Sequence, residues 1–441
     1  MQPSSSTRSP LIVFIVGLIL IIGGLIAVIV WGVAAFNQPH PVATQPIETV
    51  QSIGSATNRI AVIDQDQIYT IDPDGGNQAS ITVDGRVPTG ALIWSRAGTR
   101  LIYAATTATG SQLISVAPDD SDETILYAAE RARVPFYLYG SPDDQHVAFL
   151  QSDPAANSLN LQLTAISPTP TVQSIAIGQP DYYSWSPQSD ALLLHVGGTS
   201  RAAFIGTYHL GANALQNINT TPALFQTPMW SPIDQRLLYA RQYLEGGQLI
   251  VGDGARETAV ITFEVGLAFS WSPDANHIAY THSNLVNFTY TSLSIIDTGS
   301  QAAHQYFGGD ILAFFWSPDG SKLAYLTGAL IEPGPVGKTG GLAAPRIDQQ
   351  ALRLTWHVID LQTQQTINLM SFEPSDSFVF LVQYFDQFAQ SIEVWSPDSR
   401  SLVFTGAPFN GQSGVYVIDA TKANSTPANV GSGDFAIWSW K

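Results

Sequence analysis

The chain has 441 residues and a formal net charge of −17 at pH 7, yet only 12% of its residues are charged. With 18 Lys and Arg against 35 Asp and Glu, it has no basic stripe that could displace the counterions of a nucleic acid, which excludes nucleic acid as a partner. Cysteine is absent, so disulfide bonds, thiolate chemistry and a cysteine-linked lipid anchor are excluded.

The N-terminal region is predicted to anchor the protein in a membrane. Residues 11–36 form an uncharged apolar run, longer than the roughly 20 residues that span a bilayer core. Arg8 precedes this run and no cation follows it closely, so residues 1–10 are expected to be a cytoplasmic tail and the remaining chain to be extracytoplasmic. We therefore expect a single-pass protein of the cell membrane. A signal peptide cleaved near Ala35 is the alternative, although its apolar core would be about twice the usual length.

The apolar run is followed by a linker, residues 37–57. It contains Pro39, Pro41 and Pro46 among Gln, Thr, Ser and Ala. Such a composition favours a semi-extended polar tether, which would hold residues 58–441 away from the membrane.

Residues 58–441 repeat one motif, in which Trp is followed by Ser and in most copies by Pro. The motif recurs every 41 to 46 residues or so, with one longer gap between Trp316 and Trp395. A period in this range is typical of β-propeller blades. The copies begin at Trp94, Gly140, Trp185, Trp230, Trp271, Trp316, Trp395 and Trp438.

Each copy continues in the same register. The seventh and ninth positions after its first residue are large and apolar, as in Leu323 and Tyr325, and the position between them is smaller and also apolar. A strand that is buried on both faces fits a blade packed between two other blades. Ser-Pro-Asp-Gly is a tight turn before this strand, and a third strand that ends in Asp, as at 67–72, leads to a fourth. Four strands per repeat form a propeller blade.

The two ends of the repeat region complement each other. Residues 59–62 match the second strand of a blade but no Trp-Ser precedes them, whereas residues 434–438 match a first strand and no second strand follows. We predict that the C-terminal strand completes the N-terminal blade and closes the ring. The ring then has eight blades, if the interval from Trp316 to Trp395 holds one blade with insertions. Seven blades are the alternative, and the interval could also hold a degenerate extra blade. The basic residues at the sixth position of the copies, including Arg59 and Arg100, are interpreted as a solvated rim.

The run from Trp316 to Tyr325, Trp-Ser-Pro-Asp-Gly-Ser-Lys-Leu-Ala-Tyr, resembles the repeats of TolB-like propellers, which are also called WD40-like or PD40 repeats. The resemblance covers residues 59–441 and implies an all-β propeller of four-stranded blades. It does not imply one function, since the repeat occurs in TolB, in propeller domains of prolyl-oligopeptidase-like enzymes and in membrane-tethered proteins. TolB itself has six blades behind a separate α/β domain, and this chain departs from TolB in both respects.

Motifs for catalysis, cofactors and metals are incomplete. No Gly-x-Ser-x-Gly occurs, and Gly337-Lys338-Thr339 is preceded by Glu332 where a phosphate loop requires its first glycine. We therefore predict no catalytic residue, no cofactor and no metal ligand. The acidic segments 64–66 and 72–77 could bind Ca²⁺, but the second has the composition of an ordinary turn, so both interpretations remain open.

The segments before each Trp are predicted to line the central channel, because the strand that leads into the motif is the innermost of a blade. Converging carboxylates would raise each other's pKa and attract cations or basic peptides. Two segments, 328–350 and 378–388, interrupt the repeat and are expected to cap the ring, contact a partner or bind a ligand. The candidate binding mouth comprises Asp181, Tyr182, Tyr183, Glu264, Asp310, Phe314 and Asp434, with Tyr137, Phe315 and Glu393 as neighbours.

We interpret the chain as a membrane-anchored, noncatalytic module that binds or scaffolds a protein or peptide. The alternative is a propeller enzyme that acts on glycans or small molecules through acidic residues at the channel mouth. Two carboxylates at the separation found in glycosidases would favour the enzyme.

Overall fold

The computed structural model describes residues 57–153, 156–178, 181–198, 200–223, 227–253, 256–284, 289–331, 351–409 and 411–441. The predicted cytoplasmic tail, membrane anchor and all but the last residue of the linker lie outside these ranges, as does most of the insertion 328–350. No helix within the described ranges is long and apolar enough to cross a membrane.

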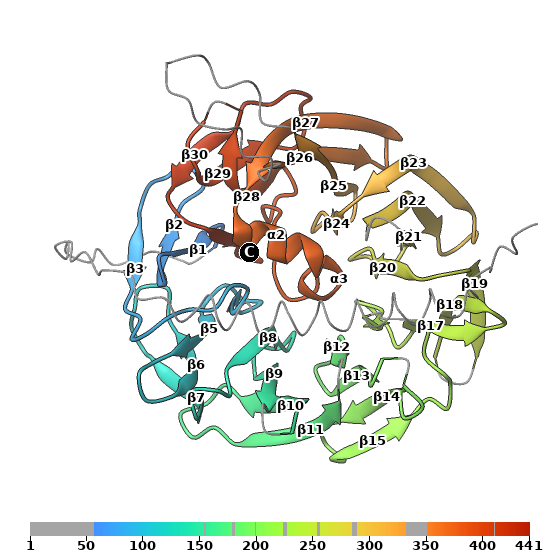
Figure 1. Cartoon of the computed structure of the whole chain (residues 1–441), viewed down its shortest axis with the longest axis horizontal. Helices are drawn as coiled ribbons and strands as arrows, with labels where there is room; N and C mark the ends of the chain where they lie inside the picture. The colour runs from blue at the N-terminus through green and yellow to red at the C-terminus, as the bar shows by residue number, and fades with distance from the viewer. Residues whose placement is uncertain are drawn as a thin grey trace, which may run out of the picture. The chain divides into compact units, whose positions relative to one another are not determined.

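Antiparallel sheets are arranged around a common centre, and strands dominate the fold, as predicted (Figure 1). In the sheets built from one repeat, the strand that ends at the Trp position is followed by three strands in sequence order toward the outside. Three such sheets are β4 (Leu92–Trp94), β5 (Leu101–Thr106), β6 (Ser111–Val116) and β7 (Thr124–Ala129); β8 (Pro135–Gly140), β9 (His146–Asp153), β10 (Ser158–Ala165) and β11 (Val172–Gly178); and β12 (Asp181–Trp185), β13 (Ala191–Val196), β14 (Phe204–His209) and β15 (Ala214–Asn217).

Two more sheets have the same plan. Their second strands are buried on both faces at the predicted columns, which explains why these columns remain apolar in every copy. These sheets are β16 (Met229–Trp230), β17 (Leu237–Tyr243), β18 (Gly246–Gly252) and β19 (Glu257–Phe263); and β20 (Leu267–Trp271), β21 (His277–Asn284), β22 (Thr289–Asp297) and β23 (Ala303–Ile311).

A seven-stranded sheet contains the strands of two successive repeats. Pairing of Phe372 with Pro408 and of Pro374 with Gly406 joins the last strand of one repeat to the next repeat. Trp395 forms a single bridge to Leu402, at the position of an inner strand. The strands are β24 (Ala313–Trp316), β25 (Lys322–Ile331), β26 (Ala351–Asp360), β27 (Gln365–Pro374), β28 (Ser401–Pro408), β29 (Gly414–Asp419) and β30 (Ala428–Gly431).

The Ser and Asp of the motif stabilise the turn that follows the inner strand. Ser317 Oγ donates to Asp319 Oδ1 at 2.6 Å and accepts the backbone N–H of Lys322 at 2.9 Å. Ser272 and Asp274 repeat the first bond at 2.5 Å. These local bonds satisfy backbone donors in the turn, which explains why both residue types recur.

Tryptophan connects neighbouring repeats. The indole Nε1 of Trp185 donates to the carbonyl of Tyr139 at 3.0 Å, and that of Trp395 donates to the carbonyl of Phe315 at 3.1 Å. Trp395 therefore lies beside the inner strand that ends at Trp316, although the chain between them is longer than in other repeats. The indoles of Trp94, Trp230 and Trp271 are buried without such an acceptor among the described residues.

The two ends of the repeat region meet, as predicted. In the remaining four-stranded sheet β31 pairs with β1, and Ile60 lies opposite Trp438. Ser439 Oγ also accepts the backbone N–H of Arg59 at 2.9 Å, and Trp438 Nε1 donates to Asn58 Oδ1 at 2.9 Å. The strands of this sheet are β1 (Ile60–Asp64), β2 (Gln67–Ile71), β3 (Ala79–Ile81) and β31 (Phe435–Trp438).

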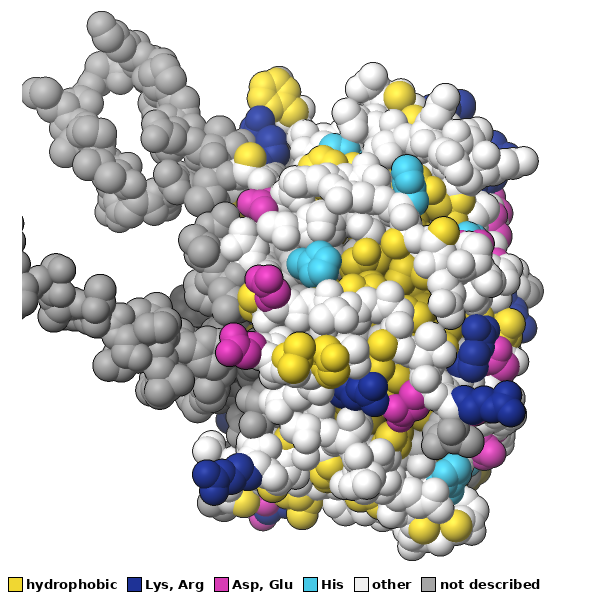
Figure 2. All heavy atoms as spheres, turned by 90° about the vertical axis from the view of Figure 1, so that its right-hand side faces the viewer, with side chains coloured by type: hydrophobic (Ala, Val, Ile, Leu, Met, Phe, Trp, Pro, Cys, Tyr) yellow, Lys and Arg dark blue, Asp and Glu magenta, His cyan; other side chains and the backbone are white. Residues whose placement is uncertain are grey.

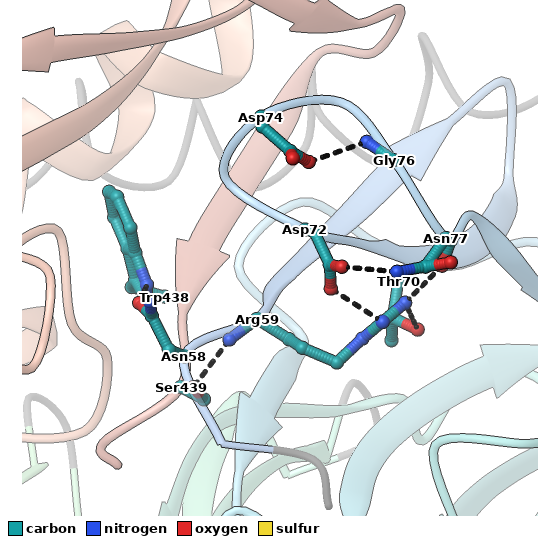
Figure 3. A network of polar contacts seen from close by, with 9 residues as sticks. All are labelled: Asn58, Arg59, Thr70, Asp72, Asp74, Gly76, Asn77, Trp438 and Ser439. Carbon is teal, nitrogen blue, oxygen red and sulfur yellow. Dashed lines mark hydrogen bonds and ion pairs between the residues drawn. The ribbon is translucent and has the colours of Figure 1, made fainter. Parts of the chain in front are cut away.

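Arg59 corrects the interpretation of the basic column as a solvated rim. Only 3% of its side chain is exposed, and it forms an ion pair with Asp72 at 2.7 Å (Figure 3). Its second terminal nitrogen donates to Thr70 Oγ1 at 2.9 Å and to the carbonyl of Asn77 at 2.6 Å. The other oxygen of Asp72 accepts from Asn77 Nδ2 at 2.6 Å, so both oxygens of this carboxylate have partners within the turn.

Replacing Arg59 by Ala is expected to lower the free energy of unfolding by about 3 kcal/mol, because it removes a buried guanidinium and leaves the partly buried Asp72 without its cation. Arg100→Ala is the matched control at the same position of the next repeat. Its partner Asp122 is 74% exposed, so we expect a loss of about 1 kcal/mol or less. Urea unfolding of both variants measures the difference, and equal losses would contradict the role assigned to Arg59.

Deleting residues 432–441 is expected to destabilise the whole ring. The deletion removes four buried side chains of β31 and leaves β1 as an open edge, so a loss of roughly 5 kcal/mol or more should follow. Circular dichroism would record a lower melting temperature, and a synthetic peptide of residues 432–441 should restore part of it. A truncated chain that melts like the intact one would show that closure contributes little.

Candidate functional site

A helical insertion occupies the centre of the ring. The chain between β27 and β28 forms α2 (Asp376–Gln383) and α3 (Phe385–Phe388), which lie at the middle of the circle of sheets in Figure 1. Ser375 begins α2, and its hydroxyl accepts the backbone N–H of Phe378 at 3.1 Å. The aromatic stretch 378–388, which was predicted to cap the ring or bind a ligand, forms these helices.

Aromatic side chains fix the helices to the surrounding strands. Phe385 contacts Phe314 and Tyr290 edge to face, with ring centroids 4.9 and 5.5 Å apart. Phe388 contacts Tyr137 in the same geometry at 5.6 Å. Because these partners come from three different sheets, the position of α3 is fixed by the ring as a whole.

Asp386 on α3 is the acidic group at this centre. Its side chain is half-buried, and Oδ2 accepts from Thr227 Oγ1 at 3.3 Å. Burial raises the pKa of Asp386 to about 6. Burial, and then the charge of Asp386, raise the pKa values of Tyr182 and Tyr290.

Tyr137 and Tyr183 hold the backbone around Asp386. The Tyr137 hydroxyl donates to the carbonyl of Gln387 at 3.1 Å, and the Tyr183 hydroxyl donates to the carbonyl of Tyr137. Tyr137 has a φ of +46°, a left-handed conformation that is unusual for an aromatic residue and often marks functional sites.

A second carboxyl group with a raised pKa lies on the segment that follows α3. Glu393 is buried, and its Oε1 accepts the backbone N–H of Trp395 at 2.9 Å. Burial raises its pKa to about 7, and the nearby Arg96 opposes part of this rise. The Arg96 guanidinium lies 3.5 Å from the centroid of the Trp440 ring and donates to the carbonyl of Gln390 at 2.9 Å.

Some of the residues predicted for the mouth lie at this centre. Tyr182 and Tyr183 on β12 and Phe314 on β24 are buried around α3. Asp434 is exposed just before β31, and its carbonyl accepts from Ser375 Oγ at 2.7 Å. Partial desolvation of its carboxyl group, followed by the charges of Asp64 and Asp376, raises the pKa of Asp434.

The remaining predicted mouth residues lie at strand ends and in a connection. Asp181 is the first residue of β12 and pairs with Val196. Glu264 is exposed in the connection between β19 and β20. Asp310 is exposed near the end of β23, where it lies opposite Thr291, the residue after Tyr290. The inner strands β20 and β24 have only five and four residues, so positions six or seven before the Trp belong to the preceding strand or connection.

Sequence reasoning missed Asp386, since it lies on an inserted helix and outside the repeat. A usable signal was present: Asp386 is the only charged residue in the aromatic run 378–388. Within the described ranges, no group of three or more His, Asp or Glu residues could hold a metal ion.

The outer side of the ring is chemically mixed. Figure 2 shows acidic, basic and hydrophobic side chains scattered over one side, without a broad patch of one charge in that view. The exposed apolar residues of the ring include Ile233 and Leu244.

Comparisons with known proteins show the fold. No protein-family model and no curated protein matches the chain. A structure of dihydro-heme d1 dehydrogenase NirN in complex with DHE has a TM-score of 0.53 and 16% identity, covering 90% of this chain and 79% of that chain. Oligogalacturonate lyase from Vibrio parahaemolyticus has a TM-score of 0.47 and 13% identity, covering 82% of this chain and 97% of that chain. TolB from Acinetobacter baumannii has a TM-score of 0.39 and 13% identity, covering 76% and 81%.

These findings correct the interpretation of the chain as a noncatalytic binding or scaffolding module. The similar structures include an enzyme, oligogalacturonate lyase, as well as TolB. At identities of 13 to 16% the likeness itself extends only to the fold.

The raised pKa of Glu393 predicts how stability depends on pH. The pKa of Glu393 is higher in the folded protein than in the unfolded chain, so ionising this group costs stability. The stabilisation that protonated Glu393 gives is fully present below about pH 4.5 and is lost as the pH rises through about 7. Glu393→Gln should therefore raise the free energy of unfolding at pH 8 by at most about 3 kcal/mol, and the melting temperature with it. At pH 4 it should have little effect. Glu264→Gln, at an exposed carboxylate, is the control. A Glu393→Gln variant that is destabilised equally at both pH values would contradict this account.

Proposed function

We propose that the protein is an enzyme that acts on a glycan or another small molecule at the centre of the ring through Asp386. The observation that carries this proposal is a half-buried carboxyl group, with a pKa raised to about 6, beside tyrosines of two different sheets, Tyr182 on β12 and Tyr290 on β22. Such a combination of aromatic walls and one perturbed acid is common in ligand-binding and catalytic sites.

Asp386 can supply two kinds of chemistry. A carboxyl group with a pKa near 6 is populated in both forms close to neutral pH, which suits proton transfer to or from a bound molecule. In its ionised form it would also stabilise positive charge that develops on the substrate, as carboxylates do in glycoside hydrolysis. Tyr182 and Tyr290 would form the walls that orient the molecule, and Thr227 holds the carboxylate.

The proposal also includes the number of blades around this site and the anchoring of the protein in a membrane. We count eight TolB-like blades, which is supported by the bond from Trp395 to Phe315 and by the two repeats in the seven-stranded sheet. Residues 11–36 would anchor the protein in the membrane and place the ring outside the cytoplasm, which rests on the apolar run and on Arg8.

Asp386→Asn is expected to abolish turnover, with kcat/KM reduced at least about 100-fold, because the amide can neither exchange the proton nor carry the charge. Asp376→Asn on the neighbouring helix removes an exposed carboxylate and should leave turnover unchanged. The assay measures cleavage of an oligosaccharide panel, neutral, acidic and amino-bearing, by the full-length chain. For an active substrate, kcat/KM should change steeply near pH 6. Unchanged turnover in Asp386→Asn, or no cleavage of any member by the intact protein, would count against the proposal.

A further inference from the structure

Asp386 has no cationic partner among the described residues. No ion pair involves this carboxylate in those ranges, and the causes of its pKa shift are burial and hydrogen bonds. The nearby Arg96 is engaged with Gln390 and Trp440 and acts on Glu393 instead. An ionised carboxylate in a partly desolvated position gains free energy from a positive charge brought to it.

The walls around Asp386 suit an organic cation. Tyr290 packs edge to face against Phe385, the residue before Asp386, with ring centroids 5.5 Å apart. The charge of Asp386 also contributes to the raised pKa values of Tyr182 and Tyr290, and Tyr384 lies two residues before Asp386 in the chain. Tyr290 and Tyr384 are only half-buried, so part of each side chain is open to a ligand. The electron-rich faces of tyrosine rings attract ammonium groups, most strongly where water is partly excluded.

A metal ion fits these residues less well. Ca²⁺ requires six to eight oxygen ligands or so, and several of them are usually carboxylates. Around Asp386 the described residues offer one carboxylate and hydroxyl groups, and no group of three or more acidic or histidine side chains occurs in the described ranges. One carboxylate with aromatic neighbours is sufficient for an ammonium group.

We propose that the molecule bound at the ring centre carries a protonated amino group, as an amino sugar or another small amine does. The ammonium group pairs with Asp386 and lies against Tyr182 and Tyr290. This inference rests on the proposed function, from which it takes the position of the ligand. The net charge of −17 concentrates such cations near the protein.

The test uses the full-length chain and isothermal titration calorimetry with glucosamine, and with glucose as the probe that lacks the amine. At pH 7.5 glucosamine should bind at least about tenfold more tightly than glucose. Between pH 7.5 and pH 5.0 the affinity for glucosamine should fall about tenfold, because Asp386 becomes protonated, and the affinity for glucose should stay constant. Asp386→Asn should remove the preference for glucosamine, whereas Asp376→Asn should keep it.

The pH dependence tests the inference even if Asp386→Asn fails to fold. Glu393→Gln should keep this dependence, because the second carboxyl group that titrates near neutral pH does not contact the amine. Equal affinity for both probes, or a preference that survives Asp386→Asn, would overturn the inference. Turnover of neutral glycans without any preference for amines would overturn it and leave the proposed function in place. Amine binding without turnover of any panel member would overturn the proposed function and leave this inference in place.

Discussion

The pairing of β31 with β1 is the constraint on which the rest of the ring depends. It brings residues from the two ends of the repeat region into one sheet, with Ile60 opposite Trp438. Without it, β1 and β31 would each expose unpaired backbone groups. Closure also sets the geometry of the centre, because every inner strand then has a neighbour on both sides.

The closed ring explains how a short helix can hold a defined position. A four-residue helix such as α3 has little stability of its own, since nucleating a helix costs more than its few hydrogen bonds return. Its position comes from Phe385 and Phe388, which pack against aromatic residues of several sheets. Asp386 lies between these two anchors, so its location is determined by packing that involves the whole ring.

The sequence predicts the regular part of this structure well, because repetition exposes the physical rule. The apolar columns, the Ser-Asp turn and the complementary ends all follow from what every blade must do. Arg59 was misjudged because the sequence pattern does not show burial: its column is partly buried in other repeats, and here Asp72, Thr70 and Asn77 surround the side chain. Glu264 and Asp310 precede the inner strands β20 and β24, which have only five and four residues, so neither residue lies on an inner strand. Asp386 lies in an insertion, where no second copy reveals a pattern.

Two of the carboxyl groups with raised pKa values, Asp386 and Glu393, lie on one segment that runs from α3 to Trp395. Each is less stable when ionised than an exposed carboxylate, so at neutral pH both oppose folding. A structural role alone would be served as well by an amide, which keeps the hydrogen bond to the Trp395 N–H without the charge. For Glu393, Arg96 compensates part of this cost within the protein. For Asp386, the compensation within the described residues is limited to the Thr227 hydroxyl and nearby backbone N–H groups. A group that destabilises the folded protein when ionised, and that lies near the partly exposed Tyr290, is best explained by what it does to a bound molecule.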